Sequence, residues 1–169
     1  MALAYLVQHG EKEPMPSDPG LTPAGRQQAS RTGRWLHGRG VQALYTSPMR
    51  RARETADHIA SVAGLAVQPD ARLAERLNWD GSQPYEAFLA LWARTTEDRD
   101  FIPPGGESSR QAGARLQAFH AGITTDLLRN LLNEDALPPQ LPATGIPPCA
   151  VTTINDLTVI TIASTAHLS

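Results

Sequence analysis

Two residues with reactive or charged side chains, His9 and Arg51, lie where α/β proteins commonly carry their sites. The apolar run before His9 is short and a glycine follows it, which is typical of a buried strand with His9 at its carboxyl end. Open α/β sheets bind ligands at that end. Arg51 falls in the first turn of a predicted helix, where unpaired backbone N–H groups and the helix dipole favour an anion. Together these positions predict a pocket for a phosphate-like anion.

Each of these residues also has a structural interpretation. A lone histidine after a strand is as often a packing residue as a functional one. The arginines at 50, 51 and 53 are ordinarily read as a solvated helix face. The predicted elements and motifs in the rest of the sequence are needed to choose between the functional and the structural interpretation.

The first half of the chain predicts strands that alternate with helices. Thr22 is a suitable N-cap, with Pro23 at the first helical position, and Ser47-Pro48 repeats this pattern before a second helix. The predicted elements are a helix from Pro23 to about Leu36 that Gly38 or Gly40 ends, a strand over 41–46, a helix from Met49 that Gly64 closes, and a short strand over 65–68.

The second half predicts helices followed by a terminal hairpin. Residues 70–81 are irregular, and the loop at 136–148 is rich in proline. The predicted elements are helices over 85–94, 107–119 and 123–132, and strands over 149–154 and 157–162 that Asn155-Asp156 would join.

Composition and element order predict the class of protein. Strands alternating with helices favour a three-layer α/β sandwich, with a mostly parallel sheet and helices on both faces. A length of 169 residues suits a single domain over 1–169. A net charge of -2 indicates no nucleic-acid partner. The single Cys149 excludes an internal disulfide, and without a signal-like start or an apolar 20-mer we expect a cytoplasmic protein with no membrane partner.

Several stretches form a joint pattern along nearly the whole chain. They are Leu6-Val7-Gln8-His9-Gly10-Glu11, the GLTPAGRQQA segment from Gly20, the SPMRRARETA segment from Ser47, the acid-bearing loop that ends at Glu75, a GGES turn from Gly105, and a second histidine block from His120. This pattern resembles the histidine phosphatase superfamily, in the phosphoglycerate mutase-like branch with the Arg-His-Gly signature.

The resemblance implies a role for each matching residue. His9 would be the nucleophile and would form a phosphohistidine that water then hydrolyses. Glu75 would protonate the leaving oxygen, and Arg51 and His120 would bind the phosphoryl oxygens together with residue 8. No metal and no cofactor are implied, and the expected partner is a small phosphorylated substrate or phosphate.

Gln8 departs from the family pattern, because it occupies the position of the signature arginine. Glutamine can donate neutral hydrogen bonds to phosphate, but it lacks the charge and the bidentate fork of a guanidinium. Losing one charged donor from such a site costs about 10² to 10³ in rate. Binding is therefore expected to survive better than turnover.

The second departure is an apparent missing strand before His120. In the family an apolar strand ends at the second histidine, whereas here Phe119 directly precedes His120. Three resolutions are open. Residues 115–119 form a short strand, a partner chain in a homodimer fills the gap, or the sheet closes around the loss and displaces His120 from the pocket. We favour a rearranged local structure.

The sequence thus predicts a phosphomonoester hydrolase that acts through a phosphohistidine. We expect Gln8 to weaken its activity. The main alternative is a catalytically silent module that binds phosphate or a partner. A phosphoglycerate mutase ranks third, because the chain offers no additional basic cluster to retain the phosphoryl group.

Overall fold

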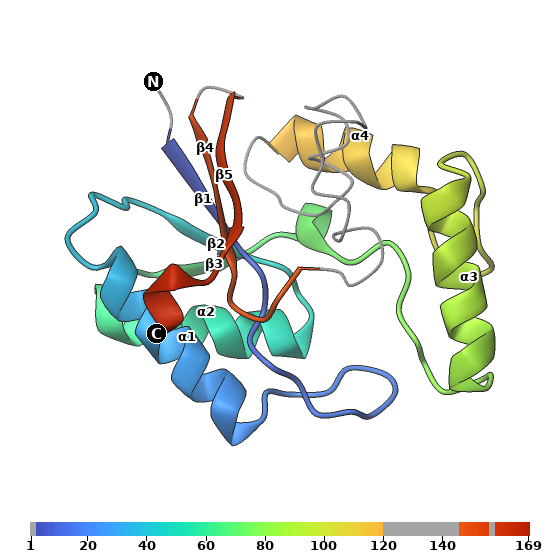
Figure 1. Ribbon diagram of the computed structural model, residues 1–169, viewed down its shortest axis with the longest axis horizontal. Helices are drawn as coiled ribbons and strands as arrows, with labels where there is room; N and C mark the ends of the chain where they lie inside the picture. The colour runs from blue at the N-terminus through green and yellow to red at the C-terminus, as the bar shows by residue number, and fades with distance from the viewer. Residues whose placement is uncertain (1–2, 120–145, 156–157) are drawn as a thin grey trace. The chain divides into compact units, whose positions relative to one another are not determined.

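A computed structural model of the chain describes residues 3–119, 146–155 and 158–169 (Figure 1). The described chain divides into two compact units. The first comprises Met1–Ala74 and Ile146–Ser169, and the second comprises Glu75–Gly145. A single domain over 1–169 stays a prediction. The mixture of helices and strands confirms the predicted α/β class.

The first unit contains most of the regular structure. Its elements are β1 (Leu3–Val7), α1 (Pro23–Leu36), β2 (Leu44–Thr46), α2 (Arg50–Ala63), β3 (Val67–Pro69), the 3₁₀ turn η1 (Ala71–Leu73), β4 (Val151–Asn155), β5 (Thr158–Ser164) and the 3₁₀ turn η3 (Ala166–Leu168).

The strands of this unit form two sheets. In the first, β1 pairs antiparallel with β4, and β4 pairs antiparallel with β5. In the second, β2 pairs parallel with β3, and α2 is the crossover between them. The mostly parallel sheet that we predicted is not confirmed, because two of the three pairings in the described residues are antiparallel. The physical reason is that β1 takes its partner from the terminal hairpin.

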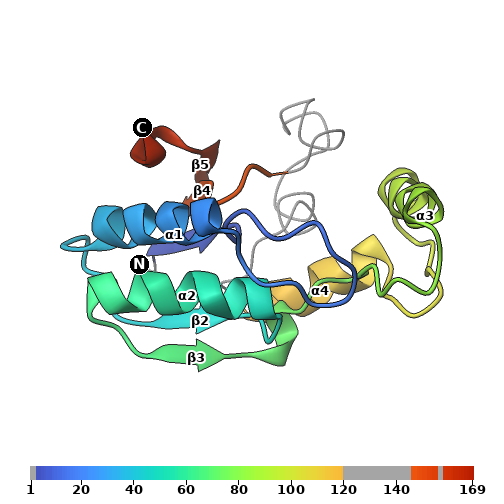
Figure 2. The same ribbon diagram turned by 90° about the horizontal axis from the view of Figure 1, so that it is seen from below.

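Helices α1 and α2 lie side by side in the first unit, and α2 separates α1 from the β2–β3 pair (Figure 2). Gly33 permits the close approach of the two helices, since a Cβ atom there would lie 3.0 Å from the carbonyl oxygen of Ile59. Tyr5 of β1 packs edge-on against Trp35 of α1, with 5.4 Å between ring centroids. The core comprises Leu6, Leu21, Ala29, Leu36, Ala56, Ile59, Cys149, Ala150, Val151 and Ile154.

The predicted helix ends of α1 and α2 are largely confirmed. The Thr22 hydroxyl accepts the backbone N–H of Gly25 at 3.0 Å, and Gly64 closes α2 in the left-handed region at φ 73°. The predicted start of α2 is wrong, because Met49 is the N-cap residue and Ser47 does not cap the helix. Instead the carboxylate of Asp18 accepts the N–H of Arg50 at 2.8 and 2.9 Å. An acceptor from a distant loop has replaced the local one.

The second unit contains α3 (Tyr85–Glu97) and α4 (Ser109–Phe119). Helix α3 is three residues longer than predicted, and α4 begins two residues later than predicted. Because α4 continues through residues 115–119, the proposal that this segment forms a strand is wrong. His120 and the predicted helix over 123–132 lie outside the described residues.

The terminal hairpin is confirmed with shifted bounds. Asn155 pairs with Thr158, so Asn155 belongs to β4, and the two residues between them lie outside the described residues. Across residues 3–119, 146–155 and 158–169, no helix combines the length and the apolar character that crossing a membrane requires.

Candidate active site

The backbone of His9 is held by the segment that leads into β4. The N–H of Gln8 donates to the carbonyl of Ala150 at 3.0 Å, and the N–H of Cys149 donates to the carbonyl of His9 at 3.1 Å. These two bonds continue the β1–β4 ladder beyond Val7. The end of the strand therefore presents His9 from a fixed backbone, as the sequence predicted.

The ring of His9 is fixed in one tautomer. Its Nδ1 atom lies 2.7 Å from the carbonyl oxygen of Gly10. A carbonyl oxygen only accepts hydrogen bonds, so Nδ1 carries the proton in the neutral ring. The lone pair is then on Nε2, and Nε2 is the nitrogen available for nucleophilic attack.

The surroundings of His9 keep its ring neutral. Burial lowers the pKa of His9, the hydrogen bond to Gly10 raises it, and the charges of Arg51 and Lys12 lower it, so that the pKa is about 4. A neutral imidazole near pH 7 retains the lone pair that a nucleophile needs.

Arg51 lies in the first turn of α2 and is buried, with 6% of its surface exposed. Thr55 connects this turn to the segment that carries His9. Its hydroxyl donates to the Arg51 carbonyl at 2.7 Å and accepts the N–H of Gly10 at 3.0 Å. One buried hydroxyl thus links the segment that carries His9 to the helix that carries Arg51.

Lys12 is a cation that the sequence analysis did not single out. The loop after His9 folds back on itself, since Lys12 forms an isolated antiparallel bridge with Leu21, and the backbone N–H of Thr22 donates to the Glu11 carbonyl at 3.0 Å. Burial and the charge of Arg51 lower the pKa of Lys12. Its position three residues after His9 was the feature of the sequence that could have indicated a cation near the site.

Glu75 belongs to the second unit. Its Oε1 atom accepts the N–H of Arg76 at 3.1 Å. The carbonyl of Arg76 accepts the N–H of Glu107, from the predicted GGES turn, at 2.9 Å. Arg76 is itself buried, and its guanidinium lies over the ring of Trp92 at 4.2 Å and donates to Thr95 at 3.2 Å. The residue that follows Glu75 is therefore held through its backbone by Glu107 and through its side chain by Trp92 and Thr95.

Of the predicted site residues, the structure brings His9 and Arg51 close together in the first unit, and Gln8 adjoins His9 in the sequence. Glu75 lies in the second unit, and His120 lies outside the described residues. The predicted roles of all five residues stay predictions. In the part of the chain that the structure describes, no three His, Cys, Asp or Glu side chains gather as a metal site.

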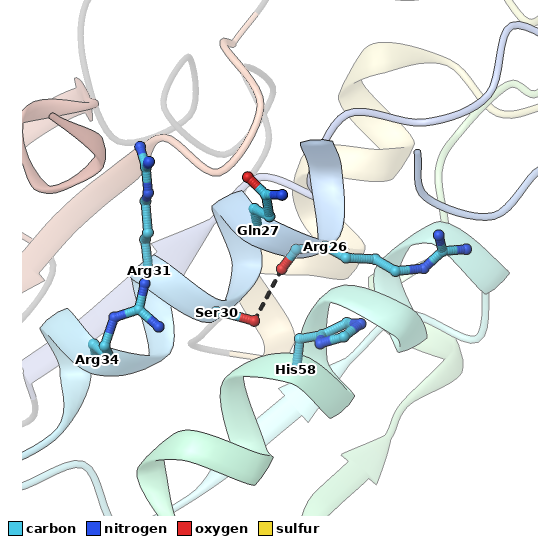
Figure 3. Close-up of a pocket in the computed structure, with 6 residues that line it drawn as sticks. All are labelled: Arg26, Gln27, Ser30, Arg31, Arg34 and His58. Carbon is cyan, nitrogen blue, oxygen red and sulfur yellow. Dashed lines mark hydrogen bonds between the residues drawn. The ribbon is translucent and has the colours of Figure 1, made fainter. Parts of the chain in front are cut away.

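An open groove of about 430 Å³ lies elsewhere, on the outer side of α1 and α2 (Figure 3). In the close-up, the side chain of Arg26 extends away from those of Arg31 and Arg34. These guanidinium groups do not converge on one point, so the groove does not form a cradle for one anion. Its lining residues are Arg26, Gln27, Ser30, Arg31, Arg34 and His58.

Comparison with curated proteins identifies relatives of the chain. A 2,3-bisphosphoglycerate-dependent phosphoglycerate mutase of Chelativorans sp. is 34% identical over 136 residues, which are 68% of this chain and 65% of that protein. The mutase of the same name from Methylorubrum populi is 33% identical over 156 residues, 80% of this chain and 71% of that protein. The chain thus spans less than two thirds of the first relative's length.

Solved structures share the fold. A mycobacterial glucosyl-3-phosphoglycerate phosphatase in complex with inorganic phosphate has a TM-score of 0.77 at 23% identity, with both chains fully covered. A phosphoserine phosphatase from Entamoeba histolytica has a TM-score of 0.71 at 20% identity, also with full coverage. At these identities the likeness shows the fold alone.

The family follows from a match over most of the sequence. The family model described as "Histidine phosphatase superfamily (branch 1)" matches residues 4–132, a range that includes His9, Arg51, Glu75 and His120. This match confirms the resemblance that the motifs indicated. The chain belongs to the histidine phosphatase superfamily, branch 1.

Proposed function

We propose that the protein is a phosphomonoester hydrolase that acts through a phosphohistidine. The observation that carries this proposal is the state of His9, which is neutral, fixed in the Nδ1–H tautomer and close to the charge of Arg51. A neutral Nε2 atom attacks phosphorus, and Arg51 stabilises the negative charge on the phosphoryl oxygens. Water then hydrolyses the phosphohistidine.

Glu75 is proposed as the acid for the leaving oxygen, and His120 as a further phosphate ligand. Both assignments rest on the family pattern. Lys12 adds a positive charge near Arg51 and His9, which supplies part of the electrostatic attraction that Gln8 lacks.

The test is turnover of p-nitrophenyl phosphate by the full chain, with His9→Ala as the inactive control. We expect turnover that His9→Ala abolishes, and an increase of about 10² to 10³ in rate for Gln8→Arg. Trapping of a phosphorylated His9 after an acid quench would show the intermediate. If neither the wild type nor Gln8→Arg turns over, the proposal fails.

The role of Glu75 has its own test, because leaving groups differ in their need for a proton. Nitrophenolate departs without protonation, whereas an alkoxide requires an acid. Glu75→Gln should therefore slow hydrolysis of an alkyl phosphate far more than hydrolysis of p-nitrophenyl phosphate. Equal losses on both substrates would exclude Glu75 as the leaving-group acid.

One observation favours a second function, a silent module that binds phosphate. The signature position carries Gln8, which removes a charged donor from beside the nucleophile. Binding of inorganic phosphate in calorimetry, without turnover in wild type or Gln8→Arg, would identify the module.

The names of the curated relatives make mutase activity a third possibility. A mutase returns the phosphoryl group to its substrate, whereas a phosphatase gives it to water. Incubation with 3-phosphoglycerate, followed by separate assays for 2-phosphoglycerate and for free phosphate, distinguishes the two reactions.

A further inference from the structure

The carboxylate of Asp18 lies at the start of α2, although Asp18 belongs to the loop before α1. Both of its oxygens accept the backbone N–H of Arg50, at 2.8 and 2.9 Å. Its Oδ1 atom also lies 3.9 Å from Nη1 of Arg51, at the edge of ion-pair distance. One side chain thus contacts both the backbone of the first helical turn and the predicted phosphate ligand.

Helix α2 requires this acceptor because its own sequence does not supply one. Met49 is the N-cap residue and makes no side-chain cap bond. The hydroxyl of Ser47 accepts the N–H of Met49 at 3.3 Å, one residue before the helix begins. The N–H of the first helical residue, Arg50, is satisfied by Asp18 instead.

The loop that carries Asp18 is anchored to α2 at a second point, one turn further along the helix. The N–H of Leu21 donates to Oε2 of Glu54 at 2.8 Å, which lowers the pKa of Glu54. Between the anchors, Gly20 lies so close to α2 that a Cβ atom there would be 2.6 Å from Oε1 of Glu54. Because the loop contacts α2 at Gly20 and Leu21 as well as at Asp18, the backbone position of Asp18 relative to the helix is fixed.

The charges of the two residues are unequally exposed. The side chain of Arg51 is 7% exposed, whereas that of Asp18 is 46% exposed. A buried guanidinium loses hydration and needs compensating negative charge nearby. Asp18 supplies such charge while its own carboxylate stays partly hydrated.

We propose that Asp18 is a positioning residue for the phosphate site, which fixes the first turn of α2 and braces the guanidinium of Arg51 in a conformation ready for phosphate. This inference rests on the proposed phosphate-binding role of Arg51. It gives a specific role to a loop residue that acts through Arg51.

The same contacts are also compatible with the opposite effect on phosphate binding, in which Asp18 occupies the place of an anion and competes with phosphate. The two accounts differ in a measurable direction. Removing a brace weakens phosphate binding, and removing a competitor tightens it. The geometry favours the brace, because the strongest contacts of Asp18 are with the backbone N–H of Arg50 and its distance to Arg51 is at the limit of pairing.

The test is calorimetric titration of inorganic phosphate into the full chain and its variants. Asp18→Ala should weaken binding about tenfold, because it removes a hydrogen-bonded carboxylate from the helix start and from Arg51. Asp18→Asn keeps an acceptor for the N–H of Arg50 and loses the charge, so its affinity should lie between those of wild type and Asp18→Ala. In an Arg51→Gln background, Asp18→Ala should have no further effect.

Asp70→Ala is the matched control. The carboxylate of Asp70 likewise accepts a backbone N–H, that of Arg72 at 2.8 Å, and pairs with the guanidinium of Arg72 at 2.6 Å. This variant should leave phosphate affinity unchanged. Thermal melts of all variants confirm folding, and the Asn variant keeps the comparison valid if Asp18→Ala is unstable.

Unchanged or tighter phosphate binding in Asp18→Ala and Asp18→Asn would overturn the inference and leave the proposed function intact. Equal effects of Asp18→Ala with and without Arg51 would also overturn it, since the role would then be a general cap. If the wild type itself binds no phosphate, the proposed phosphate site fails and the inference fails with it.

Discussion

Gly10 and Gly25 lie backbone against backbone where the loop after His9 crosses the start of α1. A Cβ atom at Gly10 would lie 2.6 Å from the carbonyl oxygen of Gly25, and one at Gly25 would collide with the carbonyl of Glu11. Two glycines therefore let the segment that carries His9 lie flat on the first turn of the helix.

Gly25→Ala should destabilise the protein, although alanine is the better helix former by about 1 kcal/mol. The clash forces a backbone shift, and overpacking of this kind costs about 1–3 kcal/mol. Urea unfolding measures the change, with the exposed position Arg34→Ala in the same helix as control. A gain in stability for Gly25→Ala would contradict the contact.

The ring of His9 should titrate far below an ordinary histidine. Burial and neighbouring cations lower its pKa to about 4, so its Cε1 proton should shift in NMR spectra near that pH. Arg51→Gln should raise the midpoint, and Lys12→Met should raise it less. His9→Gln assigns the resonance. A midpoint near 6.5 in the wild type would contradict the buried neutral ring.

The same shift has a consequence for stability. The unfolded chain binds a proton at this histidine below about pH 6.5, whereas the folded chain resists protonation until about pH 4. Stability from this residue is therefore present above pH 6.5 and is lost as the pH falls toward 4. His9→Gln should flatten the pH dependence of the unfolding free energy in this window.

Thr55→Val tests the link between the loop of His9 and the first turn of α2. Valine has the shape of threonine, but it leaves the buried N–H of Gly10 without its acceptor. The expected loss is about 1–3 kcal/mol of unfolding free energy, together with weaker phosphate binding. Thr161→Val, at an exposed position of β5, serves as the control. A neutral Thr55→Val would show that water replaces the hydroxyl.

Gly106→Ala should disturb the segment of Glu75 from within the second unit. A Cβ atom at Gly106 would lie 2.6 Å from the carbonyl oxygen of Arg76. If Glu75 is the leaving-group acid, the variant should slow hydrolysis of an alkyl phosphate more than that of p-nitrophenyl phosphate. The neighbouring variant Gly105→Ala is the control. A Cβ atom at Gly105 would meet no heavy atom within 4 Å, so this variant tests only the backbone strain at φ 72°. Identical kinetics for the two variants would contradict the positioning role.

Local signals in the sequence predicted local structure well. Thr22, Pro23 and Gly64 mark their helix ends because caps act on neighbouring residues. The family motifs placed His9 and Arg51 together, since the pattern carries long-range information that periodicity lacks.

Contacts between distant segments were not predictable in this way. The cap of α2 comes from Asp18, although Ser47 satisfied every local rule for a cap. Lys12 pairs with Leu21 because the loop after His9 folds back, and Thr55 of α2 accepts the N–H of Gly10 from the same loop. The antiparallel partner of β1 comes from the far end of the chain, and a hydrophobic run does not specify its neighbour.

This pairing of β1 with β4 also bears on the order in which the protein folds. The strand Leu3–Val7, which precedes His9, pairs in the described sheet with Val151–Asn155, a segment far from it in the sequence. Contacts so distant in sequence are slow to form, because the chain between them must be ordered first. The backbone that carries His9 is therefore fixed only after β4 has paired with β1, and until then β1 lacks its strand partner in the described sheet and is open to aggregation.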